Sequence, residues 1–288
     1  MGRLGRDDRL VSALLDWGAS SLRDLPWRRT ADPWLILVSE VMLQQTSVAR
    51  VLPKFEAFAA RYPTPSHLAA ASLGDVLVVW QGLGYPRRCR NLHLAAAAIV
   101  DAHNGRVPDS LDELLSLPGV GAYTARAVLA FAHRRDVAVV DTNVSRVLSR
   151  IDGTSMSARE LQNRADALVP RGLAWEWNQV MMDLGARICT ARAPDCSGCP
   201  AHGSCMWRGE GPDPAPGSAG ASRPQGTFEG SDRQARGRAL RALAEGTHSR
   251  KELAAAMGVE PGRAARLIDA LVSEGLAIET GRVVSMPR

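Results

Sequence analysis

The residues best suited to chemistry lie in the stretch Leu117–Arg150. Gly119 and Gly121 form a short turn after a proline, and a helical pattern of small and apolar residues starts near Ala122. Backbone N–H groups at such a helix start, beside glycines that carry no Cβ, can bind an anion such as a phosphodiester. Asp141 then follows an apolar run and precedes another helix. The stretch therefore predicts a phosphate-binding turn followed by a carboxylate, although an ordinary helical hairpin with an Asp N-cap also fits it.

A second carboxyl group, Glu40, lies in a strongly apolar segment that predicts a helix from Pro33 to about Leu52. Its neighbours one helical turn away are mostly apolar: Ile36, Leu37, Leu43 and Gln44. Apolar surroundings raise the pKa of a carboxyl group and make it a proton donor near neutral pH. A structural glutamate that is paired with an arginine or faces solvent fits the same pattern.

Four cysteines form a third group of chemical side chains. Cys189, Cys196, Cys199 and Cys205 are separated by six, two and five residues. Four thiols so close together indicate a metal–thiolate site. Only the middle pair has the Cys-x2-Cys spacing that zinc sites use twice, so the intervals favour an iron–sulfur cluster, while spacing alone leaves zinc open. Cys89 stands apart, and we expect it to be a small buried or half-buried residue.

Helical patterns fill most of the chain up to the cysteines, and nothing there demands a sheet. Residues 209–231 are rich in Gly, Pro, Ser and Ala, which is typical of a linker. In residues 232–288 we expect three helices, the second opened by a Ser249–Glu252 capping box, and a β-ribbon after Gly275. These elements predict a winged-helix-like module, which we expect to tune affinity or partner choice.

Composition limits the possible partners. The net charge of +5 favours an anionic partner, and no apolar run is long enough to cross a bilayer. The N-terminus lacks a signal-like apolar region, so we expect a cytoplasmic protein without a membrane partner. Nearly all basic residues are arginine, since the chain contains only Lys54 and Lys251 as lysines.

Taken together, these motifs resemble the helix-hairpin-helix DNA glycosylases with an iron–sulfur loop, and within them the adenine DNA glycosylases (the MutY family). The resemblance covers roughly residues 10–207. Besides the cysteines it is carried by Leu25–Arg28, Ser39–Thr46, Gly82–Tyr85, Leu117–Thr124, Val140–Asn143 and Met181–Gly185.

The resemblance implies an all-α fold of two lobes. A glycosylase domain would span residues 1–208, with a six-helix barrel at about 28–134 and an iron–sulfur lobe from 1–27 and 135–208. A linker at 209–231 and the module at 232–288 would follow. The four cysteines would hold a [4Fe-4S] cluster. The protein would act in base excision repair as a nucleoid-associated monomer on double-stranded DNA containing A:8-oxoguanine or A:G mispairs.

The family's chemistry assigns roles to four residues. The adenine is flipped out of the duplex and its N-glycosidic bond is hydrolysed. Glu40 would protonate the adenine at N7 and later help to activate water. Asp141 would stabilise the oxocarbenium-like sugar or bond to it transiently, and Asn143 and Tyr123 would hold this arrangement. One neutral carboxyl group would thus donate the proton and one charged carboxyl group would stabilise the sugar, as in glycoside hydrolysis.

Five further residues would contact DNA. Gln45 and Tyr85 resemble the residues that enter the base stack beside the orphaned partner base. Arg28 would lie near the extruded adenine, and Gly119 and Gly121 would offer N–H groups to a phosphate.

Two features depart from the family pattern. Pro86 follows Tyr85 where many relatives have a second tyrosine, and the chain has the short module in place of a large β-rich domain that reads 8-oxoguanine.

Three alternatives to an adenine DNA glycosylase stay open. An endonuclease III-like enzyme would need a lysine where Tyr123 stands, a thymine-mismatch glycosylase usually lacks the glutamate, and a silent DNA-binding protein with a structural cluster would not need the catalytic set.

Overall fold

The computed structural model describes residues 3–221 and 226–288. The fold is mostly helical, which confirms the predicted all-α class. The chain divides into two compact units. The first contains Met1–Ile36, Asp109–Leu111 and Gly121–Pro224, and the second contains Leu37–Pro108, Asp112–Val120 and Gln225–Arg288. The helices α2 (Pro33–Leu43) and α7 (Leu111–Ser116) each contain a boundary between the units.

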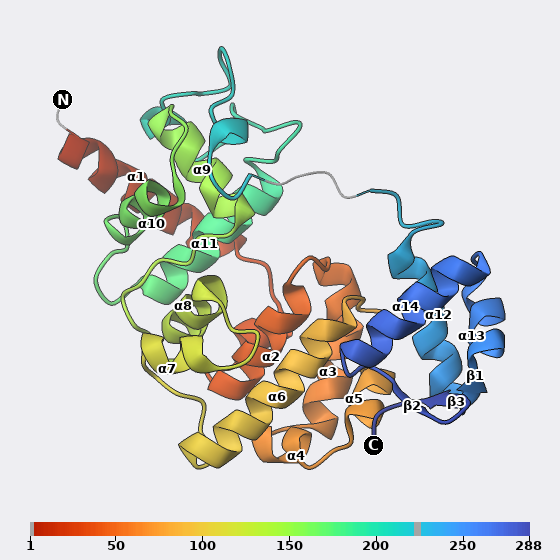
Figure 1. Ribbon diagram of the computed structural model, residues 1–288. Coiled ribbons are helices and arrows are strands. Elements are labelled where there is room, and N and C mark those ends of the chain that lie inside the picture. The colour runs from red at the N-terminus through yellow and green to blue at the C-terminus, as the bar shows by residue number, and fades with distance from the viewer. Residues whose placement is uncertain (1–2, 222–225) are drawn as a thin grey trace. The chain divides into compact units, whose positions relative to one another are not determined.

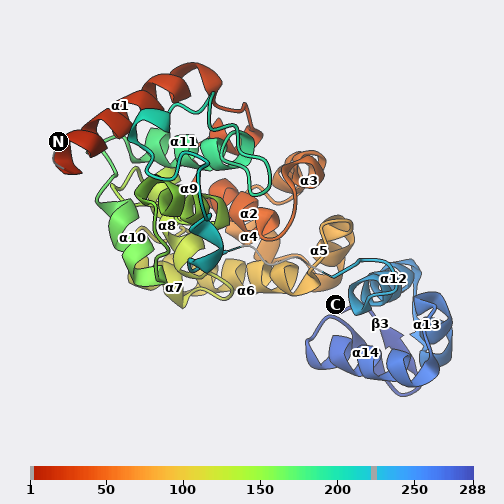
Figure 2. The same ribbon diagram turned by 90° about the horizontal axis from the view of Figure 1, so that it is seen from above.

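The first unit is built around three helices that lie side by side, α1 (Arg3–Ser21), α9 (Thr142–Asp152) and α11 (Ala174–Arg187), as Figures 1 and 2 show. Leu14, Leu148 and Trp177 are among the side chains that they bury. A Cβ on Gly18 of α1 would collide with Val180 of α11, so the close helix contact requires a residue without one. The unit also contains η1 (Pro26–Arg28), α8 (Ala122–Phe131), α10 (Ala158–Asp166), η2 (His202–Ser204) and η3 (Ala215–Gly217).

After its part of α2, the second unit contains four consecutive helices: α3 (Val48–Arg61), α4 (Pro65–Ala69), α5 (Leu73–Trp80) and α6 (Pro86–His103). Aromatic residues of α3 and α5 form a cluster between them. The ring of Phe58 meets those of Tyr62 and Trp80 edge-on, with centroids 5.0 and 5.9 Å apart. Cys89 on α6 is fully buried, as expected.

The predicted single helix from Pro33 to about Leu52 is wrong. Helix α2 ends at Leu43, Gln45 takes a left-handed φ of 54°, and α3 starts only at Val48. The interruption has a long-range cause, because the buried guanidinium of Arg88 on α6 donates hydrogen bonds to main-chain oxygens at the end of α2 and in the following turn. These bonds satisfy carbonyl groups that a helix end would leave without partners.

The C-terminal module belongs to the second unit and has the three predicted helices, α12 (Asp232–Glu245), α13 (Arg250–Met257) and α14 (Pro261–Ser273), and the predicted ribbon of β2 (Ile278–Thr280) and β3 (Val283–Ser285). The short strand β1 (His248–Ser249) was not predicted. The Ser249–Glu252 capping box is present. β3 lies between β1 and β2 in an antiparallel sheet, with His248 opposite Val284 and Thr280 opposite Val283.

The module packs on the helices α5 and α6 of its own unit. The N–H of Gly74 on α5 donates to the carbonyl oxygen of Pro287 at 2.9 Å, and a Cβ on Gly74 would collide with that oxygen. Arg87 on α6 forms an ion pair of 2.8 Å with Glu274, just after α14. The module is therefore attached at two points on the helical body.

Part of the segment that composition assigns to a linker is held on α9. Arg150 pairs with Asp213 at 2.6 Å, and Ser149 and Ser218 share a hydrogen bond of 2.7 Å between their hydroxyl groups. The buried guanidinium requires a carboxylate, and position 213 supplies it. The predicted bounds 1–208, 209–231 and 232–288 stay a prediction. Among the residues that the structure describes, no helix has the length and apolar character that a membrane span needs.

Candidate active site and cysteine-lined pocket

Asp141 caps the N-terminus of α9, as its position before a helix predicts. Its Oδ1 accepts a hydrogen bond from the N–H of Val144 at 2.7 Å, and its Oδ2 accepts one from Nδ2 of Asn143 at 3.0 Å. Desolvation by the surrounding protein raises the pKa of Asp141, while these two hydrogen bonds and the charge of Arg146 act in the opposite direction. The carboxylate is therefore held in one orientation, in a site that excludes much of the water.

Arg146 extends this arrangement toward the cysteine loop. Its Nη2 donates to Oδ1 of Asn143 at 2.8 Å and to the carbonyl oxygen of Gly185 at 2.7 Å, and its Nε donates to the carbonyl oxygen of Cys189 at 2.9 Å. The amide of Asn143 thus lies between Asp141 and a fixed cation. A continuous chain of hydrogen bonds connects the candidate catalytic carboxylate to the first cysteine.

The close approach of helix α11 to Asn143 explains why residue 185 is a glycine. A Cβ on Gly185 would lie 2.8 Å from the Cβ of Asn143, too close for any other residue. On the preceding turns of the same helix, Asn178 accepts from the N–H of Val139 at 2.8 Å and donates to the carbonyl oxygen of Val137 at 2.9 Å. The apolar run before Asp141 is therefore fixed by α11, which supports the capping geometry.

Asp183 on α11 is fully buried between two arginines. Arg28 donates to both of its oxygens at 2.8 and 3.0 Å, and Arg23 donates to it from Nε, Nη2 and the main-chain N–H. Burial alone would raise the pKa of Asp183, but the hydrogen bonds from Arg28 and Arg23 lower it to about 2. The Arg28 side chain, a predicted DNA contact, is thus 6% exposed and engaged in this ion pair. Its contact with adenine stays a prediction.

The remaining predicted residues of the first unit lie on α8. Gly121 is the N-cap of this helix, has an extended backbone, and has nothing within 4 Å of the place of a Cβ. The fold therefore does not require a glycine there, whereas a ligand that approaches the backbone closely would. Tyr123 follows in the first turn of α8 and is half-buried.

The second unit carries Glu40, Gln45, Tyr85 and Gly119. Glu40 is 5% exposed on α2, as its apolar neighbours predict. Gly119 has a φ of 77°, and a Cβ there would lie 2.6 Å from that of Asn91, so this glycine is required by the backbone itself. Gln45 and Tyr85 both take left-handed backbone conformations, with φ of 54° and 48°.

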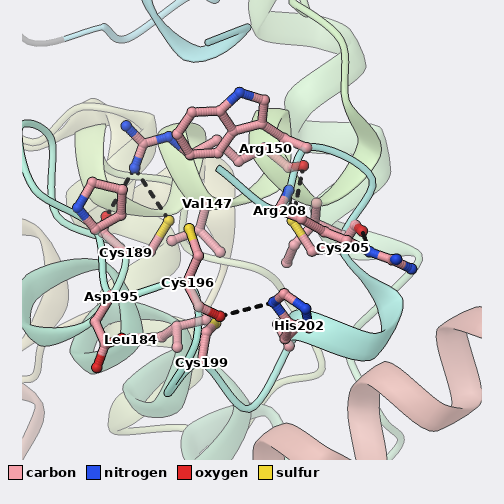
Figure 3. Close-up of a pocket in the computed structure, with 14 residues that line it drawn as sticks. Val147, Arg150, Leu184, Cys189, Asp195, Cys196, Cys199, His202, Cys205 and Arg208 are labelled. Atoms are coloured by element: carbon pink, nitrogen blue, oxygen red, sulfur yellow. Dashed lines mark hydrogen bonds between the residues drawn. The ribbon is translucent and has the colours of Figure 1, made fainter. Parts of the chain in front are cut away.

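The four cysteines line one pocket of the first unit, together with Leu184, Val147 and Trp207. Figure 3 shows Cys189, Cys196, Cys199 and Cys205 around this pocket, whose empty volume of about 370 Å³ includes space open to solvent. Within the described residues, no three or more His, Cys, Asp or Glu side chains converge as they would around a single metal ion. The four thiols are the side chains at this pocket that could hold a metal–thiolate group.

The surroundings of the sulfur atoms fit a negatively charged group. Nη1 of Arg150 lies 3.4 Å from Sγ of Cys189, as Figure 3 shows, and the main-chain N–H of Arg208 lies 3.5 Å from Sγ of Cys205. The guanidinium of Arg150 also stacks on Trp207, 4.5 Å from the ring centroid. Cationic and N–H groups directed at sulfur stabilise thiolates.

Comparisons with known proteins agree with this geometry. The sequence model of the HhH-GPD superfamily base excision DNA repair proteins matches residues 38–171. The adenine DNA glycosylase of Mycobacterium tuberculosis strain H37Rv is 46% identical over 276 residues, which cover 93% of this chain and 90% of the relative. That of Mycolicibacterium smegmatis is 44% identical over 274 residues, covering 93% and 92%. The chain belongs to the adenine DNA glycosylase family.

A solved structure titled as a thermostable thymine-DNA glycosylase has the same fold as this family member, with a TM-score of 0.67. It is 29% identical in sequence and covers 71% of this chain and 97% of its own. The match supports the helix-hairpin-helix fold. The higher identity and longer coverage of the mycobacterial enzymes place the chain with the adenine DNA glycosylases.

Sequence reasoning missed three arginines and one acid that build the sites of this family member: Arg88, Arg146, Arg150 and Asp183. Each acts through contacts with residues distant in the chain or through main-chain oxygens, which no local pattern displays. The one available signal for Asp183 was its place in the Met181–Gly185 motif.

Proposed function

We propose that this member of the adenine DNA glycosylase family removes adenine paired with 8-oxoguanine or guanine in double-stranded DNA, by hydrolysis of the N-glycosidic bond. The observation that carries the proposal is the Asp141 carboxylate, which Val144 and Asn143 hold at the start of α9. A fixed, partly desolvated carboxylate is suited to stabilise a positive charge that develops on a sugar ring.

Glu40 supplies the proton in this proposal. Its carboxyl group is 5% exposed on α2 and would protonate N7 of an extruded adenine, which improves the leaving group. Asp141 then stabilises the sugar cation or bonds to it transiently, and Glu40 helps to activate the attacking water. Asn143 and Tyr123 position Asp141 and the substrate.

DNA contacts come from both units. The open space above Gly121 at the start of α8 admits a phosphate to within hydrogen-bond reach of main-chain N–H groups, and Gly119 allows the turn that precedes it. Gln45 and Tyr85 enter the base stack, and Arg28 lies near the extruded adenine. We propose that the chain acts as a monomer in the cytoplasm, associated with the nucleoid.

Cys189, Cys196, Cys199 and Cys205 would hold a [4Fe-4S] cluster. Their distribution around one pocket, with the guanidinium of Arg150 and the main-chain N–H of Arg208 directed at sulfur, supports this group over a single zinc ion. When bound, the cluster would fix the shape of the loop and take no part in hydrolysis. Arg146 connects the carbonyl group of Cys189 to Asn143, so an ordered loop helps to keep Asp141 in place.

The test compares Glu40→Gln with the wild type in single-turnover release of adenine from A:8-oxoguanine and A:G duplexes. The amide keeps the shape of the side chain but cannot donate the proton, so we expect a fall in rate of roughly 100-fold or more with duplex binding retained. Wild-type turnover by this variant would show that another group is the acid. Release of thymine from a G:T duplex by the wild type, without release of adenine, would favour a thymine-mismatch glycosylase.

A further inference from the structure

A segment that follows the cysteines in sequence is fastened to α9 at two separate places. Residues 213–219 are here called the strap. At its far end, Ser218 is 6% exposed, shares a hydrogen bond of 2.7 Å with the hydroxyl group of Ser149, and accepts one from the N–H of Met156 at 2.9 Å. The strap is therefore a fixed part of the first unit, although its composition is that of a linker.

Asp213 fastens the near end of the strap to Arg150. The prolines on either side of this residue restrict the backbone there. Oδ1 of Asp213 accepts hydrogen bonds from Nε of Arg150 at 3.1 Å and from the N–H of Ala215 at 3.0 Å, and Oδ2 accepts one from Nη2 of Arg150 at 2.6 Å. Two parallel hydrogen bonds to a carboxylate fix both the position and the plane of a guanidinium. Asp213 thus binds one edge of Arg150.

The other end of the same guanidinium is directed at the cysteine loop. Nη1 of Arg150 donates to the carbonyl oxygen of Thr190 at 2.7 Å and to Sγ of Cys189 at 3.4 Å, the contact drawn in Figure 3. Arg150 is 2% exposed, and a buried cation that loses its carboxylate partner is strongly destabilised. The contact with sulfur therefore depends on the edge that Asp213 holds.

We propose that Asp213 is a positioning residue for the cysteine loop, which holds Arg150 against Cys189 and so controls how firmly the four cysteines retain a [4Fe-4S] cluster. The inference rests on the proposed function, because it requires the cluster named there. Hydrogen bonds to the sulfur atoms and the exclusion of water are the means by which a protein adjusts such a group. Release of Arg150 would remove one of these bonds and loosen the main chain that carries Cys189, which would give water and chelators access to iron.

The experiment follows the visible absorbance of the purified full-length protein in air with excess EDTA, at a temperature well below unfolding. In Asp213→Asn we expect the absorbance to decay about tenfold faster, because a hydrogen bond to a charged group changes a local opening equilibrium by at least that factor. Asp213→Glu keeps the carboxylate and should restore most of the retention. Glu210→Gln is the matched control, since it removes the same charge from an exposed position three residues earlier and should decay like the wild type.

A second control separates the contact with Arg150 from the general attachment of the strap. Ser218→Ala removes the hydrogen bonds at the far end, so we expect a lower Tm and a decay near that of the wild type. Decay at the wild-type rate in Asp213→Asn, or equally fast decay in Ser218→Ala, would overturn the role of Asp213 while the cluster stands. A wild type without iron would instead overturn the proposed cofactor, and release of adenine by the wild type tests the proposed activity separately.

Discussion

Replacement of Arg88 by methionine should destabilise the protein and disorder both left-handed turns, at Gln45 and Tyr85. The side chain is 9% exposed, and six oxygen atoms accept hydrogen bonds from its two terminal nitrogens. Val41 and Met42 contribute carbonyl groups from the last turn of α2, where no intrahelical donor is available. Methionine fills a similar volume and donates to none of them.

The expected size of the effect follows from two opposing contributions. Each terminal nitrogen carries two N–H groups, and hydrogen bonds from a charged donor stabilise by at least about 1.5 kcal/mol each, or roughly 6 kcal/mol for all of them. Burial lowers the pKa of Arg88 to about 10, which corresponds to a desolvation cost of about 3 kcal/mol. The difference predicts that Arg88→Met lowers the free energy of unfolding by about 3 kcal/mol.

Thermal unfolding followed by circular dichroism at neutral pH measures this loss. For a chain of this size, about 3 kcal/mol corresponds to a decrease in Tm of roughly 6–12 °C. Arg88→Lys should fall between the variant and the wild type, because an ammonium group cannot span both turns. Arg87→Met is the control, since the side chain of Arg87 itself is 69% exposed and forms one surface ion pair. A decrease in Arg88→Met no greater than in Arg87→Met would refute the reasoning.

The purified protein should be brown and contain about four iron atoms per chain, and a colourless protein with one zinc would contradict the cluster. Borohydride should trap little covalent DNA adduct, because a tyrosine occupies position 123. If trapping is efficient, loss of the adduct in Lys54→Ala would identify Lys54 as the reacting residue. Its Cε lies 3.7 Å from the place of a Cβ on Gly82. Asp183→Asn should destabilise by about 2 kcal/mol at neutral pH, because a pKa lowered from 3.8 to about 2 stabilises the fold above that range. This difference from the wild type should shrink as the pH falls from about 5 to 2, and a difference independent of pH would contradict the ion-pair account.

Local chemistry in the sequence was enough to find several parts of the sites. The spacing of the cysteines identified the residues that share one pocket, and the position of Asp141 before a helix identified an N-cap. The apolar neighbours of Glu40 indicated its burial. The three helices and the ribbon of the C-terminal module follow from capping and turn residues, which act within a few positions of the chain.

The features that the sequence did not reveal depend on distant partners. The apolar pattern through Leu43 continues into the next helix, and only the hydrogen bonds of Arg88 show why the chain turns at Gln45. In the same way, the Gly/Pro/Ser composition after residue 208 gives no sign that Asp213 neutralises Arg150. Such contacts join residues more than 40 positions apart, and a single sequence carries no record of them.

The anchoring of residues 213–219 on α9 limits how far the C-terminal module can travel. Ala219 is held there, since its N–H donates to the carbonyl oxygen of Met156 at 2.9 Å and its own carbonyl accepts from Ser145 at 2.6 Å. Helix α12 has its N-cap at Ser231, so a fully extended connection reaches only about 40 Å.

A module on so short a tether is never diluted into the surrounding solution. Its effective concentration at α5 and α6 is in the millimolar range, whatever the concentration of the protein. Contacts as weak as the surface ion pair of Glu274 with Arg87, worth about 0–1 kcal/mol, then suffice to help seat it.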